Sequence, residues 1–159
     1  YVYEKGKFTA LGLVFFGGFL VEQIGIHTGW LFGNYSYGTL LGFKAFGVPL
    51  LIGLTWCIVT LSAWHIVSFG KLSALWKFAL AGILVVMFDL ILEQFAVVYG
   101  LWSWKGGEIP LYNYVSWFAI SLAAFYVYFR LTKRADSSLY IAGVLPLLAL
   151  FFWLMLLGK

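Results

Sequence analysis

The sequence predicts an all-α membrane protein, built as a polytopic bundle of about five transmembrane helices. Of its 159 residues, 64% are hydrophobic and only 10% are charged, whereas a soluble globular domain is about half apolar and about a quarter charged. A spanning helix needs roughly 20 mostly apolar residues, and five segments of the chain meet that requirement. We therefore expect a single integral membrane helical domain over residues 1–159.

The five predicted helices cover residues 8–26, 45–69, 73–100, 111–129 and 139–157. The first carries no charge before Glu22, and the third holds Asp89 and Glu93. Pro49 is expected in the first turn of the second helix, where its missing N–H is harmless. Pro146 should kink the fifth helix unless neighbouring groups compensate for the lost hydrogen bond.

The distribution of cationic residues predicts an orientation in the cell membrane. The end that holds the N-terminus has Lys5, Lys7, Lys71, Lys77, Arg130, Lys133 and Arg134, and the other end has Lys44, Lys105 and Lys159. By the positive-inside rule, the N-terminus and the second and fourth connections are cytoplasmic. Two connections rich in Gly and aromatic residues, 27–47 and 101–113, would then face the opposite side together.

Several functional classes are excluded by composition and motifs. The ten cationic residues are scattered, so nucleic acid is not an expected partner, and the single Cys57 excludes an intramolecular disulfide. Two His are too few for a membrane di-iron enzyme, and no Asp-rich diphosphate motif, phosphate loop or GxSxG elbow occurs. We expect no cofactor and no metal. A divalent ion on Glu22, His27, Asp89 and Glu93 is the less favoured alternative.

Three of the six acidic residues, Glu22, Asp89 and Glu93, are predicted to lie within one membrane leaflet. Each costs about 2.5 to 3.5 kcal/mol on insertion scales, so their clustering needs a reason. Asp89 and Glu93 are four residues apart and therefore project from one helix face. They either form a site or link helices as polar contacts. The candidate partners for such contacts are Gln23, His27, Lys105 and Asn113.

Paired, desolvated carboxyl groups are suited to donate a proton to a very weak base such as an alkene. Aromatic side chains surround the acidic residues in the sequence, among them Trp30, Tyr35, Tyr37, Trp102, Trp104, Tyr112 and Tyr114. These residues form either an aromatic belt at the membrane interface or the wall of a pocket that stabilises a carbocation. The second interpretation is a cofactor-free design for isoprenoid chemistry.

Two blocks of the sequence resemble a known family. EQIGIHTGWLFGNYSYGTLLGFKAFGVPLLIGLTW (Glu22–Trp56) resembles the E-x-x-G-x-x-T-G-x-x-F-G-x-Y-x-Y…L-G…G-V-P-L…W pattern of bacterial and haloarchaeal carotenoid biosynthesis membrane proteins, which include carotenoid hydratases. FDLILEQFAVVYGLWSWKGGEIPLYNYVSW (Phe88–Trp117) is similar to their second signature: an Asp, an acidic residue four positions later, G-x-W-x-W, and N-F/Y-x-x-W. The two blocks cover about half of the chain, in the family's order.

The resemblance implies a hydro-lyase that adds water to the terminal C=C of an acyclic carotenoid. The expected partners are this long polyene substrate and membrane lipid. The predicted catalytic residues are Asp89, Glu93, Glu22 and His27. The predicted substrate-binding residues are Thr28, Tyr35, Tyr37, Trp102, Trp104, Asn113 and Trp117. Two alternatives stay open: an end-group cyclase of the lycopene type that uses the same protonation, and a non-catalytic carotenoid-binding or assembly subunit. An oligomer or a larger complex is also compatible with the sequence.

Overall fold

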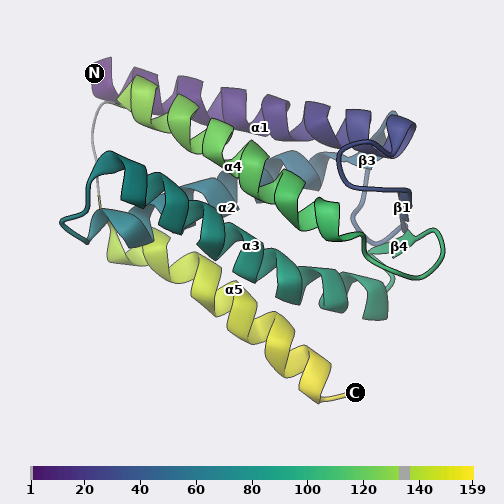
Figure 1. Cartoon of the computed structure of the whole chain (residues 1–159). Helices are drawn as coiled ribbons and strands as arrows, with labels where there is room; N and C mark the ends of the chain where they lie inside the picture. The colour runs from purple at the N-terminus through teal and green to yellow at the C-terminus, as the bar shows by residue number, and fades with distance from the viewer. Residues whose placement is uncertain (1, 133–136) are drawn as a thin grey trace.

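The computed structural model describes residues 2–132 and 137–159 (Figure 1). Lys133 and Arg134, used above to predict orientation, lie outside these residues. The described chain contains five helices: α1 (Val2–Thr28), α2 (Leu50–Ser68), α3 (Ala74–Val98), α4 (Leu111–Thr132) and α5 (Leu139–Leu157). All five are long and apolar enough to cross a membrane. The prediction of an all-α bundle of spanning helices is confirmed.

The predicted start of the second helix, at Ala45, is wrong, because residues 44–49 form a hairpin of β2 (Lys44–Ala45) and β3 (Val48–Pro49). Phe46 and Gly47 between the strands both have positive φ, 51° and 90°, as a two-residue turn of type I′ requires. Proline disfavours helical backbone in the residue before it, and Pro49 itself has ψ 137°. The helix therefore begins at Leu50.

The other predicted boundaries differ by a few residues. The first helix is longer at both ends than residues 8–26, the third spans 74–98 instead of 73–100, and the fourth continues to Thr132. The fifth matches its predicted range, 139–157. These differences change no prediction of which residues lie within a helix near the acidic groups.

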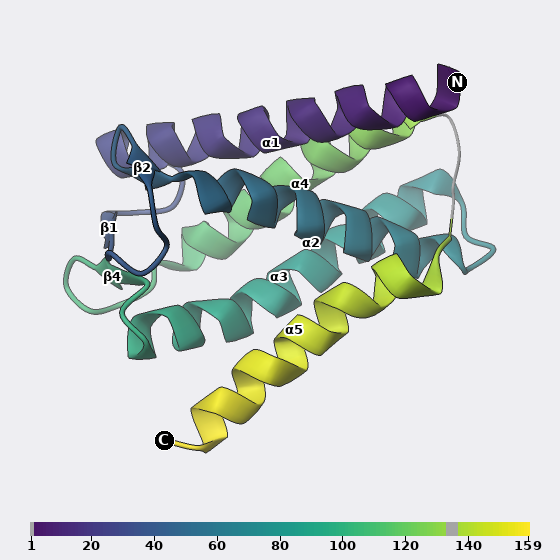
Figure 2. The same ribbon diagram turned by 180° about the vertical axis from the view of Figure 1, so that it is seen from behind.

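The helices pack so that α1 contacts α2 and α4, while α3 contacts α2, α4 and α5. Figures 1 and 2 show the N-terminus and the connection from α2 to α3 at one end of the bundle and the short strands at the other. The buried face of α1 is a stripe of small residues and one acid: Ala10, Val14, Gly18, Glu22 and Gly25. The three- and four-residue spacing of this stripe keeps it on one side of the helix.

Glycines end the two helices that carry the acidic residues. Gly29, with φ 70°, follows α1 and donates its N–H to Gly25 O at 2.8 Å, which is the αL termination. Gly100, with φ 69°, follows α3, where Leu101 N–H reaches Ala96 O at 2.8 Å and Gly100 N–H reaches Val97 O at 3.3 Å. This second pattern is the Schellman motif. Both turns send the chain back across the end of the bundle.

The returning segments pair with each other. β1 (Tyr35–Tyr37) and β4 (Trp102–Trp104) are antiparallel, with Tyr35 opposite Trp104 and Tyr37 opposite Trp102. This two-stranded ribbon, called here the aromatic ribbon, confirms that the two Gly/aromatic connections lie at the same end. Side chains alternate along a strand, so the four rings share one face, and the ribbon's two serines occupy the other.

α5 continues through Pro146, because a side chain of α2 compensates for the hydrogen bond that the proline cannot make. Proline has no N–H, which leaves the carbonyl of Ala142, four residues earlier, without its helical donor. Ser62 Oγ of α2 donates to Ala142 O at 3.1 Å and accepts from Leu145 N–H at 2.9 Å. Near the start of α5, His65 Nδ1 accepts a hydrogen bond from Ser138 N–H at 3.0 Å. These contacts fix the N-terminal half of α5 against α2.

Candidate functional site

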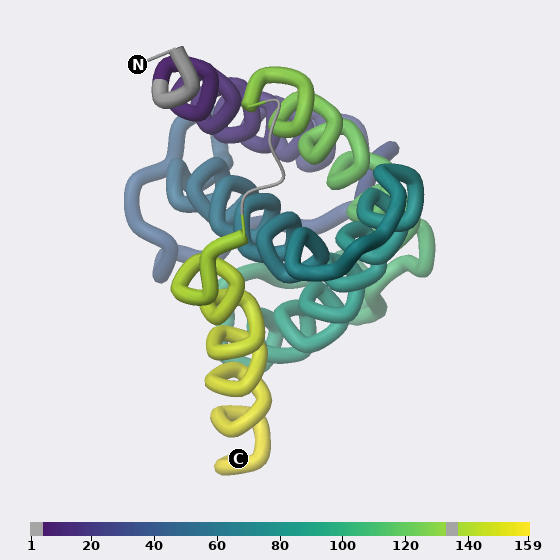
Figure 3. The backbone as a smooth tube through the Cα atoms, turned by 90° about the vertical axis from the view of Figure 1, so that its left-hand side faces the viewer, coloured from purple at the N-terminus to yellow at the C-terminus, as the bar shows by residue number. Residues whose placement is uncertain are grey.

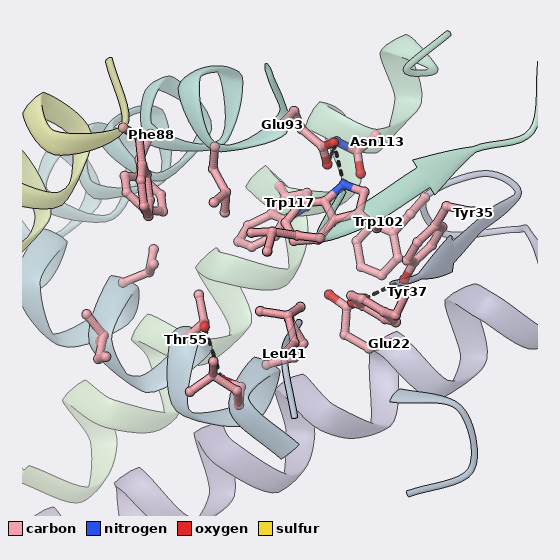
Figure 4. A pocket seen from close by; sticks show the side chains of 18 of the residues that line it. Glu22, Tyr35, Tyr37, Leu41, Thr55, Phe88, Glu93, Trp102, Asn113 and Trp117 are labelled. Carbon is pink, nitrogen blue, oxygen red and sulfur yellow. Dashed lines mark hydrogen bonds between the residues drawn. The ribbon is translucent and has the colours of Figure 1, made fainter. Parts of the chain in front are cut away.

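A cavity of about 230 Å³ lies beneath the aromatic ribbon and extends between α2, α3 and α5 (Figure 4). Glu22 and Glu93 are the two acidic residues in its wall. The remaining lining residues are mostly apolar or aromatic. They include Phe32, Tyr35, Tyr37, Leu41, Leu51, Thr55, Ile58, Phe88, Trp102, Trp104, Asn113, Trp117, Leu148 and Phe152.

Glu22 is buried and accepts three hydrogen bonds from aromatic side chains. Its Oε2 accepts from Tyr35 Oη at 2.5 Å and from Tyr37 Oη at 2.8 Å, and its Oε1 accepts from Trp56 Nε1 at 3.3 Å. The two tyrosines come from β1, which directly follows the helix that carries Glu22. This donor set holds the side chain in one position and satisfies both carboxyl oxygens.

Tyr35 and Tyr37 stay protonated beside Glu22. Burial raises the pKa of both hydroxyls above the usual value, and the nearby Glu22 carboxylate raises it further. Both effects disfavour a phenolate next to a carboxylate. The two hydroxyls therefore act as neutral hydrogen-bond donors throughout the physiological pH range.

Glu93 is also buried and has a matching arrangement on the other strand. Its Oε2 accepts from the indole N–H groups of Trp102 at 2.8 Å and Trp104 at 2.9 Å, and β4 directly follows the helix that carries Glu93. The same order of helix, acidic residue and aromatic strand thus occurs twice, although the sequence contains no repeated motif. The two carboxyl groups belong to one cavity, each held by its own strand.

Asp89 lies behind Glu93 and is not part of the cavity wall. Its side chain is 0% exposed. The Asn113 side-chain amide links the two acids, because its Nδ2 donates to Asp89 Oδ2 at 3.1 Å and lies 3.5 Å from Glu93 Oε1. The second oxygen, Asp89 Oδ1, is buried and has no hydrogen-bond partner among the described residues. Asp89 is therefore connected to the cavity wall through Asn113.

Aromatic rings form much of the wall near the acids. Tyr35 and Trp104 lie 5.0 Å apart across the ribbon, and Tyr37 and Trp102 lie 5.9 Å apart, measured between ring centroids. Such cross-strand pairs stabilise a ribbon by about 0.5–1.5 kcal/mol each. Their π faces also offer negative potential to a positively charged centre.

Trp56 is a site residue that the sequence-based list omitted. Its indole stacks on Trp117 with centroids 4.3 Å apart and planes at 14°, and it donates to Glu22. Gly18 makes room for it, since a Cβ at that position would lie 2.6 Å from Trp56 Cβ. The signal was present in the sequence, because Trp56 closes the first family-like block.

The structure brings most, but not all, of the predicted residues together. Lining the cavity are Glu22, Tyr35, Tyr37, Glu93, Trp102, Trp104, Asn113 and Trp117. His27 and Thr28 are exposed near the end of α1 and do not line it. Thr28 Oγ1 instead donates to Ile24 O at 2.6 Å and accepts from Trp30 N–H at 3.2 Å. The structure therefore places His27 and Thr28 outside the wall of this cavity.

The four residues of the alternative metal site, Glu22, His27, Asp89 and Glu93, do not form one cluster. His27 is exposed and does not line the cavity. Across residues 2–132 and 137–159, no three His, Cys, Asp or Glu side chains form a group that could hold an ion. What the cavity offers is proton transfer and hydrogen bonding by carboxyl groups within an apolar, aromatic wall.

Comparison with known proteins identifies the family of the chain. The model of the carotenoid biosynthesis protein family matches residues 2–158. The chain is 31% identical over 117 residues to the bisanhydrobacterioruberin hydratase of Haloarcula japonica, an alignment that covers 69% of this chain and 39% of that protein. The chain therefore spans about two fifths of the length of this relative. No solved structure matches the chain. By the family match over nearly its whole length, the chain belongs to the carotenoid biosynthesis protein family.

Proposed function

We propose that this protein is a carotenoid hydratase, which adds water to the terminal C=C of an acyclic carotenoid end group. The observation that carries the proposal is the pair of buried carboxyl groups, Glu22 and Glu93, held on one apolar cavity in a member of a carotenoid biosynthesis family. A similar protein is named a hydratase. The carotenoid end group would occupy the cavity, with its terminal double bond between the two acids.

Glu93 is the proton donor in this mechanism. It lines the cavity, whereas Asp89 does not. The acid proton of Glu93 adds to the less substituted alkene carbon, the π electrons form the new C–H bond, and a tertiary cation remains on the other carbon. The indole N–H groups of Trp102 and Trp104 then stabilise the carboxylate left on Glu93. Asp89 and Asn113 position Glu93 from behind.

Glu22 is the base that activates water. Tyr35, Tyr37 and Trp56 donate to its oxygens at the cavity wall, and these three hydrogen bonds stabilise its carboxylate form. A water molecule attacks the tertiary cation through its oxygen, and Glu22 accepts the proton released. Proton exchange with solvent restores both carboxyl groups, so that the net reaction adds one water and involves no change of redox state.

The aromatic wall stabilises the intermediate cation. The rings of the ribbon and of Trp117 face the cavity that contains both acids, and cation–π attraction is worth about 2 kcal/mol when water is excluded. An apolar wall also limits the number of water molecules near the cation.

The test is expression in a bacterial host that makes an acyclic carotenoid, followed by mass analysis of the pigments. We expect a product heavier by one water for each reacted end. Glu93→Gln and Glu22→Gln should abolish it, while Glu108→Gln, at an exposed residue outside the cavity, should leave it unchanged. Membrane-inserted protein must be present at equal levels in all variants.

The alternatives predict other pigments. A cyclised product of unchanged mass would show that an internal double bond, instead of water, captures the cation. Unmodified pigment that co-purifies with the protein would indicate a binding or assembly subunit. Either result would overturn the hydratase proposal.

A further inference from the structure

We propose that the cavity opens sideways between α2 and α5, and that the polyene chain of the substrate leaves through this opening into the lipid while its end group stays at the acids. The inference rests on the proposed carotenoid substrate. It adds a substrate-binding subsite, called here the side opening, made of Leu51, Thr55 and Ile58 of α2 and Leu148 and Phe152 of α5.

The cavity has a polar and an apolar end. Figure 4 shows Glu22, Glu93 and Asn113 gathered toward one side, with Phe88 and Thr55 toward the other. The polar end is closed, because these two acids, the amide and both ribbon tryptophans are buried. Apart from Thr55, the side opening consists of hydrocarbon side chains, and the Thr55 hydroxyl donates to the Leu51 carbonyl at 3.0 Å. Its surface therefore suits a hydrocarbon chain and no polar ligand.

The apolar end is incompletely covered. Every residue of the side opening keeps part of its surface exposed, and Leu51 is 45% exposed although it lines the cavity. In a spanning helix, surface that the described chain leaves uncovered is accessible to lipid. The cavity therefore communicates with the hydrocarbon phase at the level of Leu51.

The arrangement of the helices explains why the opening lies there. α5 is held to α2 near its N-terminal end by Ser62 and His65, and toward its C-terminal end it diverges from α2 in all three views (Figures 1, 2 and 3). Its far half instead packs on α3, where Phe152 lies 4.4 Å from Phe95 between ring centroids. The residues of the side opening lie where the two helices diverge, and Phe88 and Leu92 of α3 line the same cavity.

The size of the cavity requires such an exit. The α2 part of the wall, from Leu51 to Ile58, is about 10 Å long at 1.5 Å per residue. A volume of about 230 Å³ is below the range of roughly 300–1,000 Å³ of pockets that enclose a drug-sized ligand. A carotenoid is several times longer than its end group, so most of its polyene must lie outside the cavity. Lipid is the only surrounding phase in which a hydrocarbon chain is stable.

The experiment fills the side opening with indole rings and measures binding of the polyene. Leu51→Trp and Leu148→Trp place the ring in the opening. Their matched controls are Leu54→Trp and Leu147→Trp, which alter leucines of the same helices that are 47% and 66% exposed and line no part of the cavity. All variants are reconstituted in lipid vesicles with an acyclic carotenoid, and binding is read from the induced circular dichroism of the polyene.

We expect the two opening variants to weaken polyene binding by about tenfold, as overpacking of a filled site does, and the two controls to leave it unchanged. A short acyclic isoprenoid that carries the same end group without the polyene should compete equally well for all five proteins, wild type included. Equal polyene binding by wild type and both opening variants would overturn the side opening. Equal weakening by opening and control variants would do so as well.

The readout separates this inference from the proposed hydration. Binding is measured also in the Glu93→Gln background, where no turnover is expected. Loss of polyene binding on filling the opening, together with no hydrated product from the wild type, would support the subsite and refute the hydratase. Hydrated product at the wild-type rate from Leu51→Trp and Leu148→Trp would refute the subsite and leave the hydratase standing.

Discussion

Deleting the indole N–H groups that donate to Glu93 should slow catalysis, and deleting both should slow it more than deleting one. Trp102→Phe and Trp104→Phe each keep an aromatic ring but delete one N–H, at 2.8 or 2.9 Å from Glu93 Oε2. A hydrogen bond to a charged group is worth about 1.5–3 kcal/mol, and each 1.4 kcal/mol of barrier is about tenfold in rate. Each single variant should therefore lose about 10- to 100-fold in kcat/KM.

The double variant should lose more than the product of the two single losses. While one indole remains, Glu93 Oε2 keeps a donor, but the double variant leaves a buried carboxylate oxygen with none when the proton is transferred. Single-turnover rates in lipid vesicles, with the four proteins arranged as a double-mutant cycle, measure this coupling. Trp30→Phe, at a residue that is 82% exposed and outside the cavity, is the control. Wild-type rates in the folded double variant would refute Glu93 as the acid.

Three further predictions concern stability and orientation. Ser62→Ala should destabilise the protein by about 1 kcal/mol in a detergent unfolding titration, because it removes the donor to the carbonyl that the proline of α5 leaves free; unchanged stability would contradict this compensation. Burial and Glu22 raise the pKa of Tyr35 in the folded protein. The protonated Tyr35 side chain therefore makes its full contribution to stability below the pKa of about 10 that it has in the unfolded chain. This contribution is lost as the pH rises toward the raised pKa. Tyr35→Phe should therefore show a shallower alkaline loss of stability, and an unaltered profile would count against the prediction. In a Cys57→Ala background, a membrane-impermeant thiol reagent added to intact cells should label Ser36→Cys at the ribbon and not Ser73→Cys at the other end; the reverse pattern would invert the predicted orientation.

The positions of the acidic residues along their helices could be predicted from the sequence, because hydrophobic length indicates where each helix begins and ends. Asp89 and Glu93 project from one face by their four-residue spacing, and both are buried. The residue that hydrogen-bonds to both acids could not be identified from this spacing alone. Asn113 was one of four candidate partners, and only the packing of α3 on α4 selects it.

The position of His27 outside the cavity wall has a simple helical cause. The sequence offered His27 as a residue beside the acids, but His27 does not lie on the buried face of α1. The stripe of small residues that includes Gly18 and Gly25 marks the inner face, and Glu22 lies on it. His27 is five residues from Glu22, about 140° around the helix at 100° per residue. Small residues at three- and four-residue spacing mark the buried face of α1, so this pattern distinguishes Glu22 from His27.

The roles of the aromatic residues could not be predicted from composition, since a membrane belt and a pocket wall use the same residue types. At the four aromatic positions of the ribbon, the structure shows a pocket wall. Gly29 and Gly100 turn the chain back toward the acids, and the register then sets each tyrosine opposite a tryptophan. Neither the register nor the long-range pairing is visible in a single strand of three residues.

The source of the oxygen in the product tests the central claim most directly. Purified protein in lipid vesicles is supplied with an acyclic carotenoid in water enriched in heavy oxygen, and the pigment is analysed by mass spectrometry. The account predicts one heavy oxygen atom in each reacted end group, present with wild type and absent with Glu93→Gln. A product without heavy oxygen, or one of unchanged mass, would contradict it.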